Sequence, residues 1–209
     1  VICLHGLTRN SRDFEVVAPR IAALGRRVIV PDMRGRGQSA NDPDPAHYVP
    51  AVYAQDVLKL MDTLGVQKAV FVGTSMGGLI TMVLATIAPD RIAASVLNDV
   101  GPQLNVSGLS RIASYVGHVQ PVASWEEAAE AARGTNGAAF PDRADDAQFW
   151  QAFARRTFRA HRGQFGIWGL FVRRRLRTVC IETRTREALQ SYAQLVGNSL
   201  PLSMSAPSH

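Results

Sequence analysis

Short apolar runs alternate with segments of helical periodicity through residues 1–100, and this alternation restricts the fold more than any other feature of the chain. Four of the runs have the length of buried strands, and amphipathic segments lie between them. The strands are expected at Val1–Leu4, Val28–Val30, Lys68–Gly73 and Ile92–Leu97. Strands that alternate with helices form a parallel sheet covered on both faces. The sequence therefore predicts an α/β fold with a mostly parallel sheet and helices on both faces.

Apolar stripes and terminating residues mark the three expected helices. The first stripe is Phe14, Val17, Ile21 and Leu24 before Gly25, the second runs from Tyr53 to Leu64 before Gly65, and the third helix is Gly77–Ala88 before Pro89. Between the first two helices, residues 33–50 hold glycines and prolines around Asn41-Asp42. This composition predicts a long exposed loop.

Beyond Gly101 the pattern changes to helices without intervening strands. Ser124 with Glu127 forms a capping box before an alanine-rich helix, and Asp145 with Gln148 resembles a second box. The aromatic residues that follow are expected to pack within this segment: Phe149, Trp150 and Phe153. We therefore expect an α/β core over residues 1–100, a helical cap inserted over 101–161, and an Arg-rich tail over 162–209 whose structure the pattern does not predict.

The positive charge of the chain is concentrated in that tail. The net charge is +6, but residues 1–161 hold 16 Lys and Arg against 15 Asp and Glu, while residues 162–209 hold 7 Arg against 2 Glu. A charge confined to one end argues against nucleic acid as a partner of the folded core. We expect the segment from about Gly163 not to be the domain's own C-terminal part. A shifted reading frame is the preferred cause, and a genuine basic arm is the alternative.

A motif of the form G-x-S-x-G is present at Gly73-Thr74-Ser75-Met76-Gly77. It follows an apolar strand and opens the third helix, which is the strand–turn–helix setting that a nucleophile elbow requires. The sharp turn imposes a strained backbone on the serine, and the glycines two residues before and after it avoid side-chain collisions. Ser75 is therefore the candidate nucleophile, and Gly73 and Gly77 are structural members of the motif.

A serine nucleophile also needs preorganised N–H donors for the oxyanion that forms when it attacks a carbonyl group. The N–H of Met76 directly follows the serine, at the positive end of the new helix. The second donor is expected from Leu7, in the loop after the strand that ends in His5-Gly6. His5 precedes the serine in the chain, and we expect it to hold this loop rather than to act as the base.

Four motifs, in this order and spacing, resemble the α/β-hydrolase fold family over about residues 1–160. They are His5-Gly6-Leu7, Asp32-Met33-Arg34-Gly35-Arg36-Gly37-Gln38-Ser39, Gly73-Thr74-Ser75-Met76-Gly77-Gly78 and Asn98-Asp99-Val100-Gly101-Pro102. The chain is similar to the bacterial esterases, lactonases and carbon–carbon hydrolases of this family, which carry a helical cap after the sixth strand. The resemblance implies that two strands before Val1 are missing from this sequence.

The resemblance also implies a reaction, namely acyl transfer to water through an acyl-enzyme on Ser75. The substrate would be a small carboxylic ester, a lactone, a thioester or a similar carbonyl compound, and neither a cofactor nor a metal ion is expected. Epoxide hydrolases and haloalkane dehalogenases of the family carry aspartate at the elbow. The serine therefore argues against those two activities.

In this family the acid and the base follow the nucleophile in the order Ser, Asp or Glu, His. Asp99, at the end of the fourth strand, is the candidate acid, and Glu182 after the run Thr178–Ile181 is the alternative. The histidines after the nucleophile are His118, His161 and His209. The first two lie within the expected helical insertion, and His209 is the last residue of the sequence. The base stays unassigned, and we expect the chain as written to be an impaired catalyst.

Two functions of different classes stay open. One is the hydrolase, and the other is a noncatalytic α/β-hydrolase-like binding protein whose Arg-rich tail contacts an acidic partner or nucleic acid. The unencumbered elbow around Ser75 favours the hydrolase. No apolar run approaches the roughly 20 residues of a membrane span, and Cys3 and Cys180 make no metal or redox spacing. These features predict a cytoplasmic protein without a membrane partner, and its oligomeric state stays open.

Overall fold

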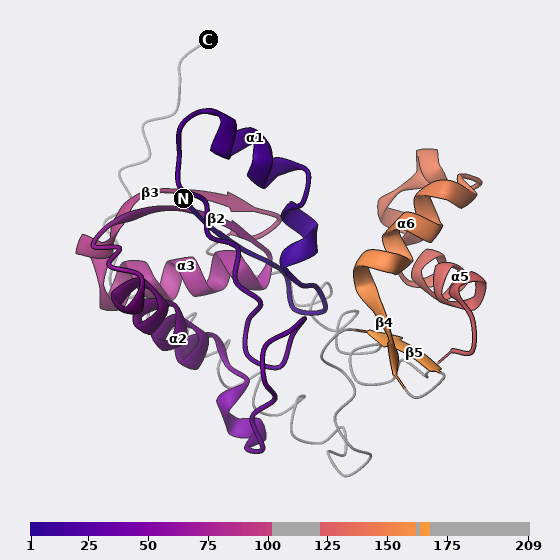
Figure 1. The fold of residues 1–209 in the computed structure, drawn as a ribbon, viewed down its shortest axis with the longest axis horizontal. Helices are drawn as coiled ribbons and strands as arrows, with labels where there is room; N and C mark the ends of the chain where they lie inside the picture. Colours follow the sequence, from indigo (N-terminus) through magenta and orange to yellow (C-terminus); the bar gives the residue numbers. More distant parts are fainter. Residues whose placement is uncertain (102–121, 162–163, 168–209) are drawn as a thin grey trace.

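A computed structural model describes residues 1–101, 122–161 and 164–167 of the chain. Its first part is built on a parallel sheet in the order β1-β2-β3 (Figure 1). The strands are β1 (Ile2–Leu4), β2 (Ala69–Thr74) and β3 (Ile92–Asn98). Leu4 pairs with Gly73, and Thr74 pairs with Asn98. The carboxyl ends of the three strands therefore meet at one edge of the sheet, where the loops of the site begin.

The strand predicted at Val28–Val30 is reduced to one parallel bridge between Ile29 and Ile2. The N–H of Cys3 donates to the carbonyl oxygen of Ile29 at 2.9 Å, and the N–H of Ile29 donates to that of Val1 at 2.9 Å. Because β2 occupies the other edge of β1, Ile29 lies on the outer side of the sheet. Within the described residues it has no second strand neighbour, which accounts for the short pairing.

Helices cover the sheet on both faces, as the sequence predicts. In Figure 1, α1 (Val17–Ala23) lies on one side of the sheet, and α2 (Pro50–Thr63) and α3 (Met76–Ile87) lie on the other. α2 begins with a proline, whose missing N–H costs no hydrogen bond at the first helical position. Its apolar face forms the core together with the sheet and α3, and the buried members include Tyr53, Val57, Met61, Ile2, Leu4, Phe71, Ile80 and Leu84.

The first helix is shorter than its apolar stripe suggests. Residues Ser11–Phe14 form a separate 3-10 turn, which Asn10 caps by accepting the N–H of Arg12, and α1 begins only at Val17. Phe14 is buried, whereas Val17 is 44% exposed and Leu24 is 78% exposed. The prediction of one helix that includes both Phe14 and Leu24 is therefore wrong, because the locally capped 3-10 turn ends at Phe14 and α1 begins separately at Val17.

The loop predicted to be exposed over residues 33–50 is buried in its first part. Met33 is 3% exposed and Arg36 is 6% exposed. The carboxylate of Asp32 accepts the N–H of Ser11 at 2.7 Å and the N–H of Gln38 at 2.8 Å. These two bonds fold the segment back against the loop that follows β1. The exposed-loop prediction is wrong for this part because it considered composition and not the hydrogen bonds that the Asp32 carboxylate accepts.

The second part of the described chain is a helix pair with a hairpin. α5 (Trp125–Asn136) and α6 (Ala147–Thr157) precede an antiparallel pair of strands, β4 (Phe158–His161) and β5 (Gln164–Ile167). The expectation of helices without strands in this segment is therefore wrong. The hairpin also extends past residue 161, where the helical segment was expected to end. Its strands are only four residues long, the shortest run over which alternation of apolar and polar residues indicates a strand.

Side-chain caps open both helices of this second part. The hydroxyl oxygen of Ser124 accepts the N–H of Glu127 at 3.1 Å, as the capping box predicts. α6 is capped by Asp146, one residue later than the predicted Asp145, and its carboxylate accepts the N–H of Phe149 at 2.9 Å. The expected aromatic packing is present, because Trp150 and Phe153 are buried in a cluster with alanines of α5.

None of the helices within the described residues has both the length and the apolar content that crossing a membrane would require.

Candidate active site

Ser75 occupies the turn between β2 and α3 in a backbone conformation that side-chain-bearing residues rarely adopt. Its angles are φ 50° and ψ −113°, and such a conformation costs on the order of 1–3 kcal/mol. The N–H of Ser75 donates to the carbonyl oxygen of Asn98 at 2.9 Å, and its own carbonyl oxygen accepts the N–H groups of Gly78 and Leu79 at 2.9 and 3.1 Å. These bonds hold the strained serine that the motif predicts.

Two glycines allow this turn to pack closely. A Cβ atom at Gly73 would lie 2.5 Å from the carbonyl oxygen of Gly77, and a Cβ atom at Gly77 would lie 2.0 Å from the carbonyl oxygen of Leu4. Both distances are far shorter than a van der Waals contact, so any side chain there would displace backbone. The spacing of the motif therefore has a physical reason: β1 and the turn around Ser75 are in direct backbone contact.

The loop after β1 lies directly beside Ser75. Because β1 and β2 are parallel and Leu4 is opposite Gly73, Gly6 comes level with Ser75. A Cβ atom at Gly6 would lie 3.8 Å from the Cβ of Ser75 and 3.9 Å from the carbonyl oxygen of Thr74. The loop that contains Leu7 is thus on the same side of the sheet as the serine, as an oxyanion hole requires.

The peptide between Gly6 and Leu7 is held through its carbonyl group. The carbonyl oxygen of Gly6 accepts Nδ1–H of His5 at 2.8 Å and the N–H of Arg9 at 3.2 Å. The C=O and N–H of a trans peptide point in opposite directions, so these bonds also orient the N–H of Leu7. That N–H has no hydrogen-bond partner within the described residues. Met76 opens α3, where N–H groups of the first turn have no partner in the helix.

His5 is completely buried, and both of its ring nitrogens are engaged. Nε2 accepts the N–H of Met33 at 3.1 Å, which leaves the proton on Nδ1 for the carbonyl oxygen of Gly6. Burial lowers the pKa of the ring, because the charged imidazolium would lose its hydration. A neutral ring without a free nitrogen fixes the loop and is not available as a general base.

Arg36 supports the same loop from the other side. Its Nε donates to the carbonyl oxygen of Leu7 at 2.6 Å, and its guanidinium lies 6.0 Å from the centre of the Tyr48 ring. The loop beside Ser75 is therefore held at two consecutive carbonyl groups, those of Gly6 and Leu7. The sequence analysis included Arg36 only as part of a family motif. A basic residue within a Gly-x-Gly turn is the signal that would have singled it out.

Asp99 immediately follows β3, next to the residue whose carbonyl group accepts the N–H of Ser75. It is exposed and has a positive φ of 55°. The structure thus brings the candidate acid to the same sheet edge as the candidate nucleophile. Among the candidates for the base, His118 and His209 lie outside the described residues, as does the alternative acid Glu182. His161 ends β4, where its backbone pairs with Gln164.

The chain is similar in sequence to known hydrolases. A family model described as "alpha/beta hydrolase fold" matches residues 1–167. The 3-hydroxybutyrate-oligomer hydrolase of Cupriavidus necator is 44% identical over 117 residues, which cover 56% of this chain and 40% of that protein. The chain thus spans less than half the length of this curated relative.

Two solved structures agree with that assignment. An alpha/beta hydrolase from Novosphingobium aromaticivorans has a TM-score of 0.75 at 44% identity, over 80% of this chain and 58% of that one. An esterase from Mycobacterium tuberculosis has a TM-score of 0.61 at 28% identity, over 80% of this chain and 54% of that one. The match of the family model over most of the chain, together with the similar fold of these structures, leads to one conclusion: the chain belongs to the alpha/beta hydrolase fold family.

Proposed function

We propose that the chain carries the nucleophile and the oxyanion hole of a serine hydrolase that cleaves a carboxylic ester, a lactone or a related carbonyl compound. The observation that carries the proposal is the strained Ser75 beside the Gly6–Leu7 peptide. A structural turn would not need a strained serine beside a peptide whose N–H has no hydrogen-bond partner among the described residues. The names of the relatives, an oligomer hydrolase and an esterase, favour an ester substrate.

The reaction follows from these positions. Ser75 Oγ attacks the carbonyl carbon of the substrate, its proton passes to a general base, and the carbonyl oxygen becomes an oxyanion. The N–H groups of Leu7 and Met76 donate to that oxyanion. When the tetrahedral intermediate collapses, the alcohol leaves with the proton from the base and an acyl group stays on Ser75. Water then attacks the acyl-enzyme in the same way, releasing the acid and restoring the serine.

Asp99 is the proposed acid because it lies at the sheet edge that carries Ser75. Among the described side chains the histidines are His5 and His47, and His47 Nδ1 is hydrogen-bonded to Asp42 at 2.9 Å in the loop before α2. We expect turnover by the chain to be slow, since loss of the histidine in a serine protease costs on the order of a million-fold in turnover.

Covalent labelling of the serine tests the proposal without requiring turnover. A fluorophosphonate probe is added to the folded chain over a series of imidazole concentrations, which supply an external base, and the adduct is located by mass spectrometry. We expect one adduct, on Ser75, whose rate of formation rises with imidazole. Ser75→Ala should abolish it, and Ser95→Ala, which removes an exposed serine in β3, should leave it unchanged.

The alternative outcomes separate the two classes of function. An adduct that persists in Ser75→Ala would place the nucleophile elsewhere. A folded chain that forms no adduct at any imidazole concentration would support the noncatalytic binding protein. If labelling is fast without imidazole, the variants His118→Ala, His161→Ala and His209→Ala will identify the base.

A further inference from the structure

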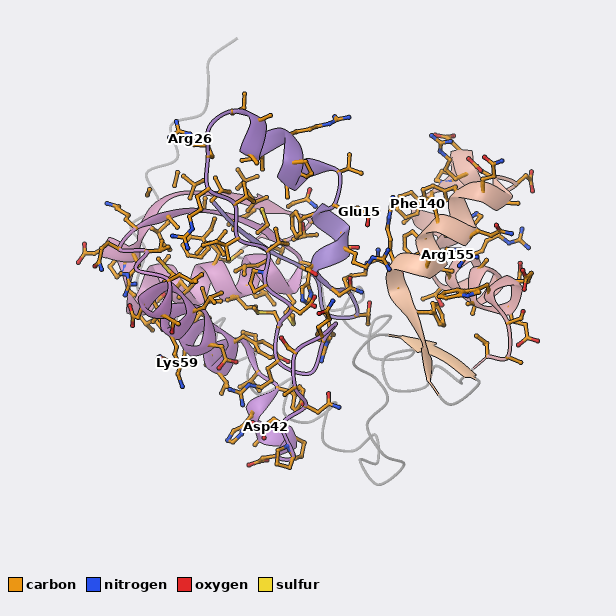
Figure 2. All side chains as sticks on the ribbon, in the orientation of Figure 1. Glu15, Arg26, Asp42, Lys59, Phe140 and Arg155 are labelled. Carbon is orange, nitrogen blue, oxygen red and sulfur yellow. The ribbon has the colours of Figure 1, made fainter. Side chains whose placement is uncertain are left out.

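The loop that follows the Gly6–Leu7 peptide makes direct contacts with the end of α6. Arg9 and Asn10 come two and three residues after Leu7, and α6 ends at Thr157. Figure 2 shows this contact region, where Glu15 lies on the side of the core that faces α6 and forms an ion pair with Arg156. The segment that carries the oxyanion donor is thus also the segment that meets the cap.

Asn10 is a buried polar residue that bonds to both sides of this contact. It is 2% exposed. Its Oδ1 accepts the N–H of Arg12 at 3.0 Å on the core side, and its Nδ2 donates to the carbonyl oxygen of Arg156 at 2.7 Å on the cap side. The last carbonyl groups of a helix have no partner within that helix. Asn10 therefore terminates α6 from outside it.

Arg9 makes a second connection between the same two segments. Its backbone N–H donates to the Gly6 carbonyl oxygen, and its Nε donates to Asp13 at 2.9 Å. From this fixed position Nη1 donates to the hydroxyl oxygen of Thr157 at 2.7 Å, and the guanidinium lies 4.3 Å from the centre of the Phe153 ring. Phe153 belongs to the buried cluster of the cap. Arg9 therefore links the oxyanion peptide to the packing of the cap through one side chain.

We propose that Arg9 and Asn10 are positioning residues that hold the end of α6 in register with the Gly6–Leu7 peptide, so that the cap and the oxyanion hole move as one unit. The coupling itself rests on contacts between described residues. Its catalytic consequence rests on the proposed function, because it requires Leu7 to be an oxyanion donor. A displacement of α6 would then turn the Leu7 N–H away from the oxyanion.

Two conservative variants separate this positioning role from the capping of the turn Ser11–Phe14 by Asn10. Asn10→Asp keeps an oxygen that can accept the N–H of Arg12, but it removes the donor to the Arg156 carbonyl and puts a carboxylate against it. Thr157→Val removes the acceptor for Arg9 from the cap side with little change in volume. The matched control is Asp146→Ala, which removes the side chain that accepts a hydrogen bond at the N-terminus of α6, the opposite end of the same helix.

Hydrogen exchange measured by mass spectrometry tests the coupling whether or not the protein is a catalyst. In Asn10→Asp and in Thr157→Val we expect faster exchange in two separate peptides, one that contains Gly6–Asn10 and one that contains the end of α6. Asp146→Ala should accelerate exchange only at the start of α6. The coupling is overturned if both test variants loosen the end of α6 and leave the Gly6–Asn10 peptide at the wild-type rate.

Fluorophosphonate labelling in imidazole tests the catalytic consequence. We expect the limiting rate of labelling at saturating probe to fall about tenfold in Asn10→Asp, which is less than the loss of a whole oxyanion donor causes. The final labelled fraction should stay complete, because partial unfolding would lower that fraction instead of the rate. An unchanged limiting rate in both test variants would overturn the positioning role. Absence of any label on the wild-type chain would contradict the proposed function, while the exchange result would still decide the coupling.

Discussion

β1 and β3 are neighbours of the same strand, β2, yet they differ in how completely they are covered. All three residues of β1 are fully buried, whereas Val96 and Leu97 in β3 are 54% and 39% exposed. β1 has β2 on one edge and Ile29 on the other, while β3 pairs with β2 alone within the described residues. The loop that contains Gly6 and Leu7 follows β1, the covered strand, and Asp99 follows β3, the exposed strand. The site is therefore firmly supported on one side and weakly supported on the other.

The largest expected difference between the two sides is in the cost of removing apolar side chains. Leu4→Ala, in β1 at 0% exposure, should lower the free energy of unfolding by about 2–5 kcal/mol, because it leaves a cavity in the core. Val96→Ala should cost below about 1 kcal/mol, since its side chain is half exposed. Urea unfolding followed by circular dichroism measures both. A cost above about 2 kcal/mol for Val96→Ala would show that β3 is covered in solution.

Two adjacent glycines at the start of α3 give a second, smaller contrast. A Cβ atom at Gly77 would meet the Leu4 carbonyl oxygen in β1, whereas one at Gly78 would lie 2.3 Å from Cγ1 of Val100, a side chain that follows β3. A backbone carbonyl cannot move without shifting the strand, but the Val100 side chain can rotate. Gly77→Ala should therefore destabilise the fold by about 3 kcal/mol, and Gly78→Ala by about 1 kcal/mol. Equal costs in urea unfolding would contradict the difference in support.

The smallest expected effect is a pH dependence that originates on the covered side. Burial lowers the pKa of His5 below its ordinary value of 6.5. The unfolded chain therefore binds a proton at a higher pH than the folded chain does, and stability is complete above pH 6.5 and falls as the pH drops below it. The slope can reach about 1.4 kcal/mol per pH unit. Urea midpoints from pH 7.5 to pH 5.5 measure it.

His5→Asn is the matched variant for this measurement. It has no titrating ring, so its urea midpoint should change less over the same pH interval, although its stability at pH 7.5 should be lower. A pH slope in His5→Asn as steep as that of the wild-type chain would assign the dependence to other groups.

The sequence predicted those parts of the fold that depend on neighbouring residues. The strands around Ser75, the helices α2 and α3 and the box at Ser124 follow from local periodicity, from glycines and from caps. The single bridge at Ile29, the buried turn around Arg36 and the β4–β5 hairpin depend on partners far along the chain. Hydrophobic periodicity along the sequence gives no information about such distant partners.

The same limit applies to the candidate site. The prediction that Ser75 lies in a strained turn is confirmed, because one short motif specifies that turn. The bond from Arg36 to the Leu7 carbonyl and the contacts of Asn10 with α6 could not be predicted, because each joins segments that are far apart in the sequence. The roles of Leu7, Met76 and Asp99 stay predictions. The frame-shift prediction for the Arg-rich tail also stays a prediction, since residues 168–209 lie outside the described residues.

The pairing of β1 with β2 also has a consequence for how the protein is made. Gly6 and Ser75 are separated by about 70 residues of sequence, and contacts between such distant segments form late in folding. During synthesis the apolar β1 segment leaves the ribosome before its partner strand has been translated. It must stay free of aggregation until then, because exposed strand edges associate readily. A nascent chain that ends before β2 would therefore be prone to aggregation.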